Sequence, residues 1–358
     1  MLNRLPHWTV VLPLAGCATL LLSPWLPVAA PMVLLVALIL AGTVFAAVHH
    51  AEVVAHRVGE PLGTLVLALA VTVIEVALII SMMVGGGPDK AALARDTVFS
   101  AIMIVCNGIV GICLLLGGLR HHVQGFQLQG ANAALGVLIP LAVLTLVLPN
   151  FMSSEAGPAL GASQLAFTGL VSLTFYGVFV FVQTIRHRDY FLVPGSHDED
   201  EHAPPPGNRA AAVSALLLLL ALVAVVGLAK LLSPTIERAV AAAGAPAAVV
   251  GVIIAALVLM PEGLAAARAA RADRLQTSLN LALGSALASI GLTIPALAAI
   301  YVTLGQPLVL GLGTRDIVLL VLTLFVSTMT LATGRTTVLQ GMVHLLLFAV
   351  FLFLSVVP

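Results

Sequence analysis

Two glutamates, Glu75 and Glu262, are the residues of this sequence whose positions most need a chemical explanation. Each lies inside a long apolar run, whereas the other carboxylates lie in polar segments or near the ends of such runs. If the runs span a membrane, each buried carboxylate costs about 2.5–3.5 kcal/mol on insertion scales, and no Lys or Arg lies at similar depth to neutralise it. A bound cation or proton would offset that cost. The alternative is a pair of protonated glutamates that only hydrogen-bond to neighbouring helices.

The residues around each glutamate offer further oxygen atoms. Pro261 has no N–H group, so the carbonyl oxygen of Leu257 loses its usual helical donor. A free carbonyl beside the Glu262 carboxylate is the kind of hard oxygen ligand that suits Ca²⁺ or Na⁺. A kink without any ligand role is the alternative. In the other run, Thr72 lies three residues before Glu75 and therefore shares its helical face.

The apolar runs that follow the two glutamates carry further polar side chains. Ser100 and Asn107 are seven residues apart, and Ser285 and Ser289 are four apart, so each pair is predicted to share a helical face. Hydroxyl groups often bond back to their own helix, and small residues also serve close helix packing, so these remain the alternatives. The predicted cation- and proton-binding groups are Glu75, Glu262, Thr72, Asn107, Ser100, Ser285, Ser289 and the Leu257 carbonyl, with Pro261 in a structural role.

Histidines and cysteines are interpreted mainly as structural. His344 is the histidine deepest in an apolar run, where a packed or helix-pairing role is favoured over a proton relay. The histidine-containing acidic segment 197–202 could sense a metal ion, but such segments are more typically solvated linkers. The three cysteines show no metal-ligand spacing and are read as small buried side chains.

Composition identifies the elements that must position these residues. The chain has 358 residues, of which 61% are apolar and 8% charged, and its mean hydropathy is +1.15. Soluble domains carry about 25% charged residues, so this chain is not a soluble enzyme, a nucleic-acid-binding domain or a secreted disulfide scaffold. Long unbroken apolar runs argue against a β-barrel. The predicted fold is therefore an all-α polytopic membrane protein with no nucleic-acid partner.

Eleven membrane-spanning helices are predicted from the apolar runs. Their expected ranges are 8–28, 31–49, 60–86, 97–119, 131–150, 163–185, 210–232, 244–267, 277–304, 315–334 and 337–357. Lys and Arg divide ten to five between the two sides, which predicts a cytoplasmic N-terminus. With eleven spans, the C-terminus is then expected outside.

The polar segment 186–209 divides the chain. We expect an N-terminal helix in 1–30, a five-helix repeat in 31–185, an acidic cytoplasmic loop in 186–209, and a second five-helix repeat in 210–358. Two halves with an odd number of spans must insert with opposite orientations. This is the arrangement of an inverted-repeat transporter.

Several segments resemble a known family. GEPLGTLVLALAVTVIEVALI (59–79) and VLMPEG (258–263) resemble the two α-repeats of the cation/Ca²⁺ exchanger superfamily, especially the bacterial ChaA-type calcium (sodium, potassium)/proton antiporters. The resemblance extends to RDTVFSAIMIV, the acidic central loop, LGSALASIGLTIP and STMTLATGRTTVLQG (327–341). It implies an N-terminal span plus two inverted five-span repeats, and it implies that Glu75 and Glu262 alternately hold cation and proton. It also implies transported ions in place of a cofactor.

The sequence departs from the calcium-selective relatives at two places. Those relatives carry Gly-Asn-Ala where this chain has Val71, Thr72 and Val73, and Gln where it has Ala288. Fewer side-chain oxygens leave room for Na⁺ or K⁺ in place of strict Ca²⁺ selectivity. We therefore expect a secondary active cation/proton antiporter of a bacterial inner (plasma) membrane, not an enzyme, exporting Ca²⁺ and/or Na⁺ and K⁺ by alternating access. A cation channel or an intramembrane carboxylate-dependent enzyme is the alternative, and the oligomeric state is left open.

Overall fold

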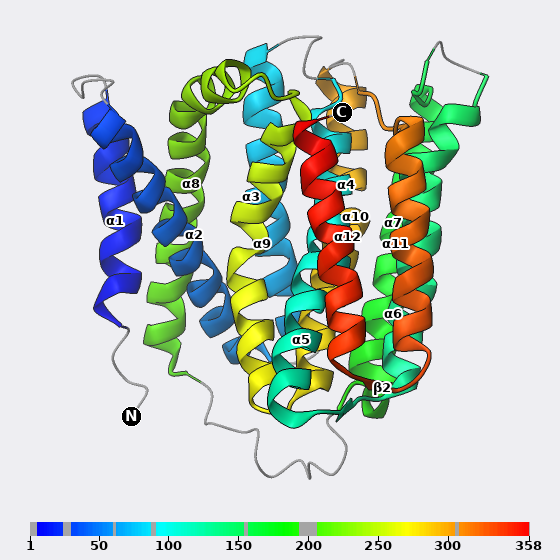
Figure 1. Ribbon diagram of the computed structural model, residues 1–358. Coiled ribbons are helices and arrows are strands. Elements are labelled where there is room, and N and C mark those ends of the chain that lie inside the picture. The colour runs from blue at the N-terminus through cyan, green and yellow to red at the C-terminus, as the bar shows by residue number, and fades with distance from the viewer. Residues whose placement is uncertain are drawn as a thin grey trace. The chain divides into compact units, whose positions relative to one another are not determined.

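Helices make up nearly all of the computed structural model, which describes residues 6–23, 30–59, 62–86, 91–153, 157–192, 206–304 and 308–357 (Figure 1). Backbone groups cannot hydrogen-bond to lipid, and a helix satisfies them internally. Ten helical segments of the described chain are long and apolar enough to cross a membrane. The all-α, polytopic membrane fold predicted from the composition is thereby confirmed.

The chain forms two compact units. The first comprises Met1–Gly85 and Asp198–Gly244, and the second comprises Gly86–His197 and Ala245–Pro358. Each unit therefore draws helices from both of the five-helix segments expected from the sequence. Glu75 belongs to the first unit and Glu262 to the second.

The first unit contains α1 (His7–Leu22), α2 (Ala30–Val58), α3 (Leu62–Gly86) and α8 (Asn208–Ala242). The helices α1, α2 and α8 pack against one another. Gly16 permits close packing, because a Cβ there would lie 2.9 Å from the Cβ of Ala224 and 3.2 Å from the Thr43 hydroxyl. At one end, the Arg57 guanidinium donates to the side chain of Asn208 and joins α2 to the start of α8.

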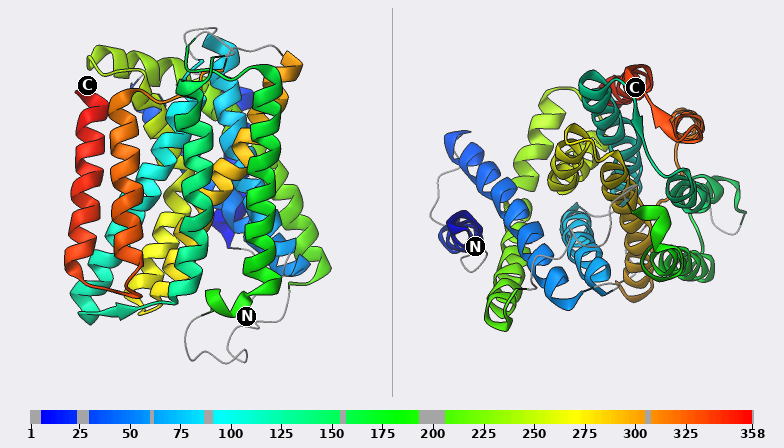
Figure 2. Two further views of the ribbon diagram at one scale, coloured as in Figure 1. Left: turned by 90° about the vertical axis from the view of Figure 1, so that its right-hand side faces the viewer. Right: turned by 90° about the horizontal axis from the view of Figure 1, so that it is seen from below.

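The second unit contains the remaining helices. Its segments are α4 (Leu93–Met103), η3 (Ile104–Ile109), α5 (Val110–His121), α6 (Leu128–Ala142), η4 (Val143–Val147), η5 (Leu148–Phe151), α7 (Ala162–Phe181), η6 (Val182–Arg186), η7 (Arg188–Phe191), α9 (Ala248–Arg271), α10 (Leu275–Leu304), α11 (Thr314–Leu331) and α12 (Val338–Val356). The segments η3, η4 and η6 are π-helical. Within this unit the helices run roughly along a common direction (Figures 1 and 2).

The continuous span α4–η3–α5 forms the centre of the second unit. It is in contact with α9, α10 and α12, and 89% of its most apolar stretch is buried, against 22–61% in the other spans. Gly251 allows α9 to approach closely, since a Cβ there would lie 2.9 Å from the backbone carbon of Asp96. The helices that carry Asn107 and Glu262 are therefore packed directly side by side.

A short strand pair closes one end of the second unit. β1 (Gln124–Gly125) pairs antiparallel with β2 (Arg335–Thr336), below α5 and α12 in Figure 1. The Gln124 amide donates to the Ala270 carbonyl at 3.0 Å and to the Asp273 carboxylate at 2.8 Å. These bonds hold the end of α9 against the segment that follows α5.

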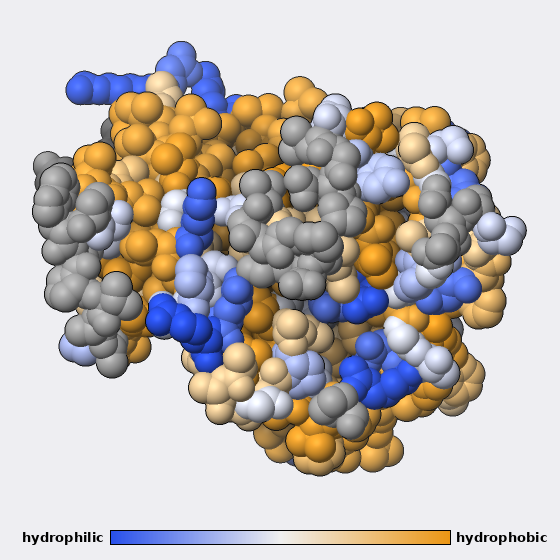
Figure 3. Space-filling model, turned by 90° about the horizontal axis from the view of Figure 1, so that it is seen from above, coloured by the Kyte–Doolittle hydropathy of each residue, from blue (hydrophilic) through white to orange (hydrophobic). Residues whose placement is uncertain are grey.

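The described helices differ from the expected spans mainly at their ends. α1 has only 16 residues, about 24 Å at 1.5 Å per residue, and is shorter than the ten candidate spans. α8 continues to Ala242, ten residues beyond its expected end, because charged residues end a membrane segment without ending a helix. Most of the acidic loop, including 197–202, lies outside the described residues. Figure 3 shows one end of the molecule, where hydrophilic groups interrupt a mostly hydrophobic surface.

Candidate cation-binding site

Glu262 lies within α9, immediately after Pro261. The helix runs without interruption from Ala248 to Arg271 and includes the proline. Pro261 is buried, whereas Glu262 and Leu257 are half-buried. Since proline has no N–H, the Leu257 carbonyl lacks its helical donor even though the helix continues. One turn of α9 therefore presents a carboxylate and a carbonyl oxygen without its usual helical bond.

Glu75 lies at the middle of α3, and its side chain is only 3% exposed. Thr72 is 4% exposed and lies one turn earlier on the same face. Within the described part of the chain, the Thr72 hydroxyl has no hydrogen-bond partner. Its oxygen is thus buried one turn before a carboxylate, without the bond to its own helix that other threonines, such as Thr97 and Thr145, make.

Asn107 lies at the same depth as Glu262 within the second unit. The helix pair is parallel, because Gly251 of α9 packs on Asp96 and Gly263 packs on Ile109. The first step spans twelve residues along α9 and the second thirteen along the facing span, so Glu262 is level with the turn of η3 that contains Asn107.

The helix α10 runs in the opposite direction to α5, and two of its serines lie near the depth of Asn107 and Glu262. The Cys113 thiol of α5 lies beside the Ser278 hydroxyl near the start of α10. Ser285 follows seven residues later, and Asn107 precedes Cys113 by six, so the two lie within about one turn of each other in depth. Ser289 is one further turn along and is 6% exposed. The second unit thus brings Asn107, Glu262 and Ser285 into one layer.

Ser100 does not share the surroundings of Asn107. Its hydroxyl donates to the Asp96 carbonyl at 2.6 Å, within its own helix. The π-helical segment η3 begins at Ile104, between the two residues, so their seven-residue spacing no longer corresponds to two regular α-helical turns. The Ser100 hydroxyl thus makes the bond to its own helix that was given as the alternative, and its role as a ligand stays a prediction.

Asn107 belongs to a buried polar network that joins three spans. Its carboxamide nitrogen donates to the Thr323 hydroxyl of α11 at 2.8 Å. Its oxygen lies 3.2 Å from His344 Nδ1 of α12, and His344 Nε2 lies 3.1 Å from the Thr330 hydroxyl. The helix-pairing interpretation of His344 is confirmed. Thr323 and Thr330 were missed by the sequence reasoning, because each of them alone resembles a packing residue.

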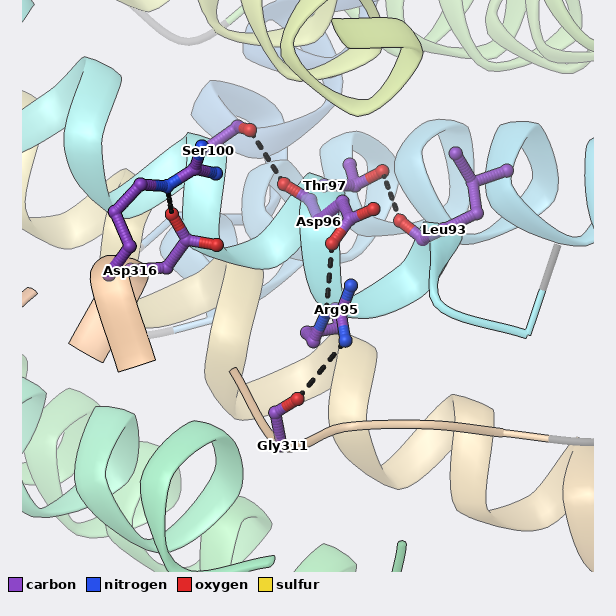
Figure 4. A network of polar contacts seen from close by, with 8 residues as sticks. Leu93, Arg95, Asp96, Thr97, Ser100, Gly311 and Asp316 are labelled. Atoms are coloured by element: carbon purple, nitrogen blue, oxygen red, sulfur yellow. Dashed lines mark hydrogen bonds and ion pairs between the residues drawn. The ribbon is translucent and has the colours of Figure 1, made fainter. Parts of the chain in front are cut away.

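A charged cluster, seen from close by in Figure 4, lies at the starts of α4 and α11, at the opposite end of the second unit from the strand pair in Figure 1. Arg95 and Arg315 each pair with the aspartate that follows it, at 2.8 and 2.9 Å. Arg95 also donates to the Gly311 carbonyl at 3.1 Å, and Asp96 and Asp316 are close enough to interact electrostatically. The repeated Arg-Asp pair is the signal in the sequence. Since Arg315 also donates to the Leu354 carbonyl at 2.8 Å, the two arginines join α4 to the segment before α11, and α11 to α12.

Resident metal sites and disulfides are not found in the described residues. No group of three or more His, Cys, Asp or Glu side chains there could hold a metal ion. The three cysteines are free thiols.

Comparison with known proteins gives the class. The sodium/calcium exchanger protein family matches residues 28–185 and 213–357. The chain belongs to this family, so it is a multi-pass membrane cation antiporter and not an enzyme. The ions are its substrates, and proteins of this family carry no cofactor.

Individual relatives cover nearly the whole chain. A Sinorhizobium fredii protein named as an ionic transporter, y4hA, is 54% identical over 99% of this chain and 97% of its own length. The sodium-potassium/proton antiporter ChaA of Escherichia coli is 38% identical over 98% of this chain and 96% of its own. The solved structure of YfkE matches with a TM-score of 0.73 at 18% identity, covering 98% of this chain and all of the other. The last match concerns the fold alone.

Proposed function

We propose that this protein exchanges Na⁺, K⁺ and/or Ca²⁺ for protons, with Glu75 and Glu262 holding cation and proton alternately. The observation that carries the proposal is the placement of these two carboxylates at the middle of α3 and α9 in a chain that belongs to an exchanger family. The similarity to a sodium-potassium/proton antiporter over 98% of the chain supports protons as the counter-ion and monovalent cations as substrates.

Competition for the two carboxylates would couple the fluxes. An empty, ionised site is costly in a dry occluded state, whereas a protonated or cation-loaded site is not. Movement of helices around the site would then give exchange instead of leak. Thr72, Asn107, Ser285, Ser289 and the Leu257 carbonyl are proposed as further oxygen ligands, and Ser100 as an outlying one at the approach to the site.

The proposed setting is a bacterial inner membrane with two oppositely inserted five-helix repeats, 31–185 and 210–358, after an N-terminal helix. The ten-to-five distribution of Lys and Arg supports a cytoplasmic N-terminus and an external C-terminus. In this orientation the proton-motive force can drive cation export, since one charge crossing 100 mV is worth about 2.3 kcal/mol. A reporter fused after Pro358 should be active only outside the cytoplasm.

Proton flux in everted vesicles tests the function. Addition of Na⁺, K⁺ or Ca²⁺ separately should release accumulated protons for the cations that are transported, in a fixed ratio to cation uptake. Cation flux without coupled proton movement would instead indicate a channel. The absence of any flux from inserted protein would reopen the possibility of an intramembrane enzyme.

Cation binding to solubilised protein tests the shared site. Because protons and cations compete for the same carboxylates, raising the pH from 6.5 to 8.5 should lower the cation concentration needed for half-saturation. Binding should release protons, and the pH dependence should disappear in Glu262→Gln protein that retains residual binding. A pH-independent affinity without proton release would contradict the shared-carboxylate mechanism.

A further inference from the structure

The network around Asn107 is a chain of hydrogen bonds with a defined direction. Asn107 Nδ2 donates to Thr323 Oγ1 at 2.8 Å, and the Thr323 hydroxyl lies 3.4 Å from the Met103 sulfur. With the amide nitrogen facing Thr323, the carboxamide oxygen faces His344 and can only accept. His344 Nδ1 must therefore carry a hydrogen and donate to it. In the neutral imidazole, Nε2 then accepts from the Thr330 hydroxyl.

This hydrogen-bond network is buried within the second unit. Asn107 and His344 have no exposed surface, and Thr323 is 1% exposed. A buried polar group that loses its partner costs about 1–3 kcal/mol, so the network strongly favours one orientation of the carboxamide. The carboxamide oxygen has two lone pairs, and His344 occupies one.

Asn107 lies in a stretch of irregular helical backbone that the network can restrain. Asn107 lies in η3, where π-helical hydrogen bonds replace the regular α-helical pattern. Such segments are often found at functional sites. The restraint comes from α11 and α12, helices that carry none of the proposed ion ligands. Besides packing contacts such as Phe348 on Gly108, those two helices hold η3 by the hydrogen bonds to the Asn107 side chain.

We propose that His344 is a positioning residue of the exchanger, fixing the Asn107 carboxamide in the orientation that leaves its second lone pair for the transported cation. The inference rests on the proposed function, because it assigns Asn107 to the cation site. The Nδ1–H donor of His344 sets the affinity for the cation through Asn107, while the proton exchanged for the cation stays on the glutamates.

Two substitutions separate the two ring nitrogens. The amide nitrogen of asparagine can occupy the place of Nδ1, so His344→Asn keeps a donor for Asn107 and loses the contact with Thr330. The amide of glutamine reaches the place of Nε2, so His344→Gln keeps the Thr330 contact and loses the donor to Asn107. The two variants have similar polarity, and each removes the imidazole.

Exchange is measured in vesicles as the half-saturating cation concentration and the maximal rate per inserted molecule. We expect His344→Gln to raise the half-saturating concentration about tenfold, equivalent to about 1.4 kcal/mol, with a smaller change in the maximal rate. His344→Asn should remain within about twofold of the parent. His7→Gln, at an exposed histidine, serves as the matched control and should change neither quantity.

Equal losses in the Asn and Gln variants, or a loss of rate without a loss of affinity, would overturn the proposal in favour of simple packing. A His344→Asn protein whose exchange no longer depends on pH would also overturn it, by showing that the imidazole carries the proton. Thermal stability of solubilised protein confirms that each variant folds. Glu262→Gln separates the failure of this inference from the failure of the proposed function. If Glu262→Gln abolishes exchange while His344→Gln matches the parent, the proposed function stands and only the role of His344 is wrong.

Discussion

The surroundings of Glu75 and Glu262 differ, although both lie in the second span of their half of the chain. Glu75 is withdrawn from solvent in a helix without proline, with the Thr72 hydroxyl one turn before it. Glu262 is half-buried and directly follows a proline, and the residue one turn before it is Leu259. One helix thus offers a side-chain oxygen beside its carboxylate, and the other offers the backbone oxygen of Leu257.

This difference indicates that two glutamates at corresponding positions of the two halves need not have the same kind of oxygen group beside them. A hydroxyl group can donate as well as accept, so it can accompany either an ionised or a protonated carboxylate. A carbonyl oxygen can only accept, so it suits a cation or a protonated carboxyl group. We therefore expect the two helices to respond differently to changes near their glutamates, while both glutamates remain necessary.

Neutralising either glutamate gives the largest expected effect. Glu75→Gln and Glu262→Gln should each reduce coupled exchange at least about 100-fold, equivalent to about 2.7 kcal/mol, because an amide cannot alternate between charged and neutral forms. The measurement is proton-coupled cation flux, normalised to inserted protein. Near-normal exchange in one variant would break the comparison by showing that one carboxylate is only structural.

Restoring the missing helical donor tests the backbone oxygen of α9. Pro261→Ala gives the Leu257 carbonyl an N–H partner, so we expect the half-saturating cation concentration to rise about three- to tenfold, up to about 1.4 kcal/mol. Thermal stability should rise, because proline disfavours a helix interior by about 3 kcal/mol relative to alanine.

Pro140→Ala in α6 is the matched control. That proline also lies inside a helix of the second unit, so its replacement should raise stability without changing cation affinity. If both proline variants leave affinity unchanged, the Leu257 carbonyl is not a ligand, and the two helices differ only in shape.

Removing the hydroxyl of Thr72 should have a smaller effect with an unusual signature. Thr72→Val should raise the half-saturating concentration about threefold, or about 0.7 kcal/mol, without lowering stability, because the described residues give this hydroxyl no partner to lose. Thr174→Val, whose hydroxyl bonds its own helix at Leu170, is the control for affinity. An unchanged affinity together with a stability loss would assign Thr72 to packing.

Deleting residues 197–202, which lie between the two halves, should have the smallest effect. Solvent-exposed carboxylates in general interact weakly, typically by about 0–1 kcal/mol, and the sequence predicts that those of this segment are solvated. Maximal coupled exchange should therefore stay within about twofold, and any change should be confined to its calcium dependence. Flux and calcium response are measured in the same vesicles. Normal insertion without any exchange would place the loop in the transport path.

The sequence was most informative where apolar runs end at loops. The run expected from 163 begins at Ala162, and the run expected from 315 begins at Thr314. It was least informative where a helix leaves the apolar region, as α8 does before Ala242, because hydropathy reports the surrounding medium and not backbone hydrogen bonding.

The candidate site could be predicted only in part, for a related reason. A carboxylate in an apolar run, such as Glu75 or Glu262, can be recognised from the neighbouring residues of the sequence. The partners of Asn107 do not, because Thr323 and His344 are 216 and 237 residues away in the chain. The π-helical turn at η3 has no distinctive residue pattern, so nothing in the sequence indicates that regular α-helical spacing is interrupted between Ser100 and Asn107.

The long span from Leu93 to His121 is anchored at both ends and interrupted in the middle. Arg95 ties its beginning to the Gly311 carbonyl at 3.1 Å, and His121 lies 3.1 Å from the Arg271 carbonyl at its end. A rod that is fixed at both ends takes up torque where it is weakest, and here that section is the π-helical turn η3. Twisting of either end would therefore be concentrated at Asn107, making this turn the torsional joint of the second unit.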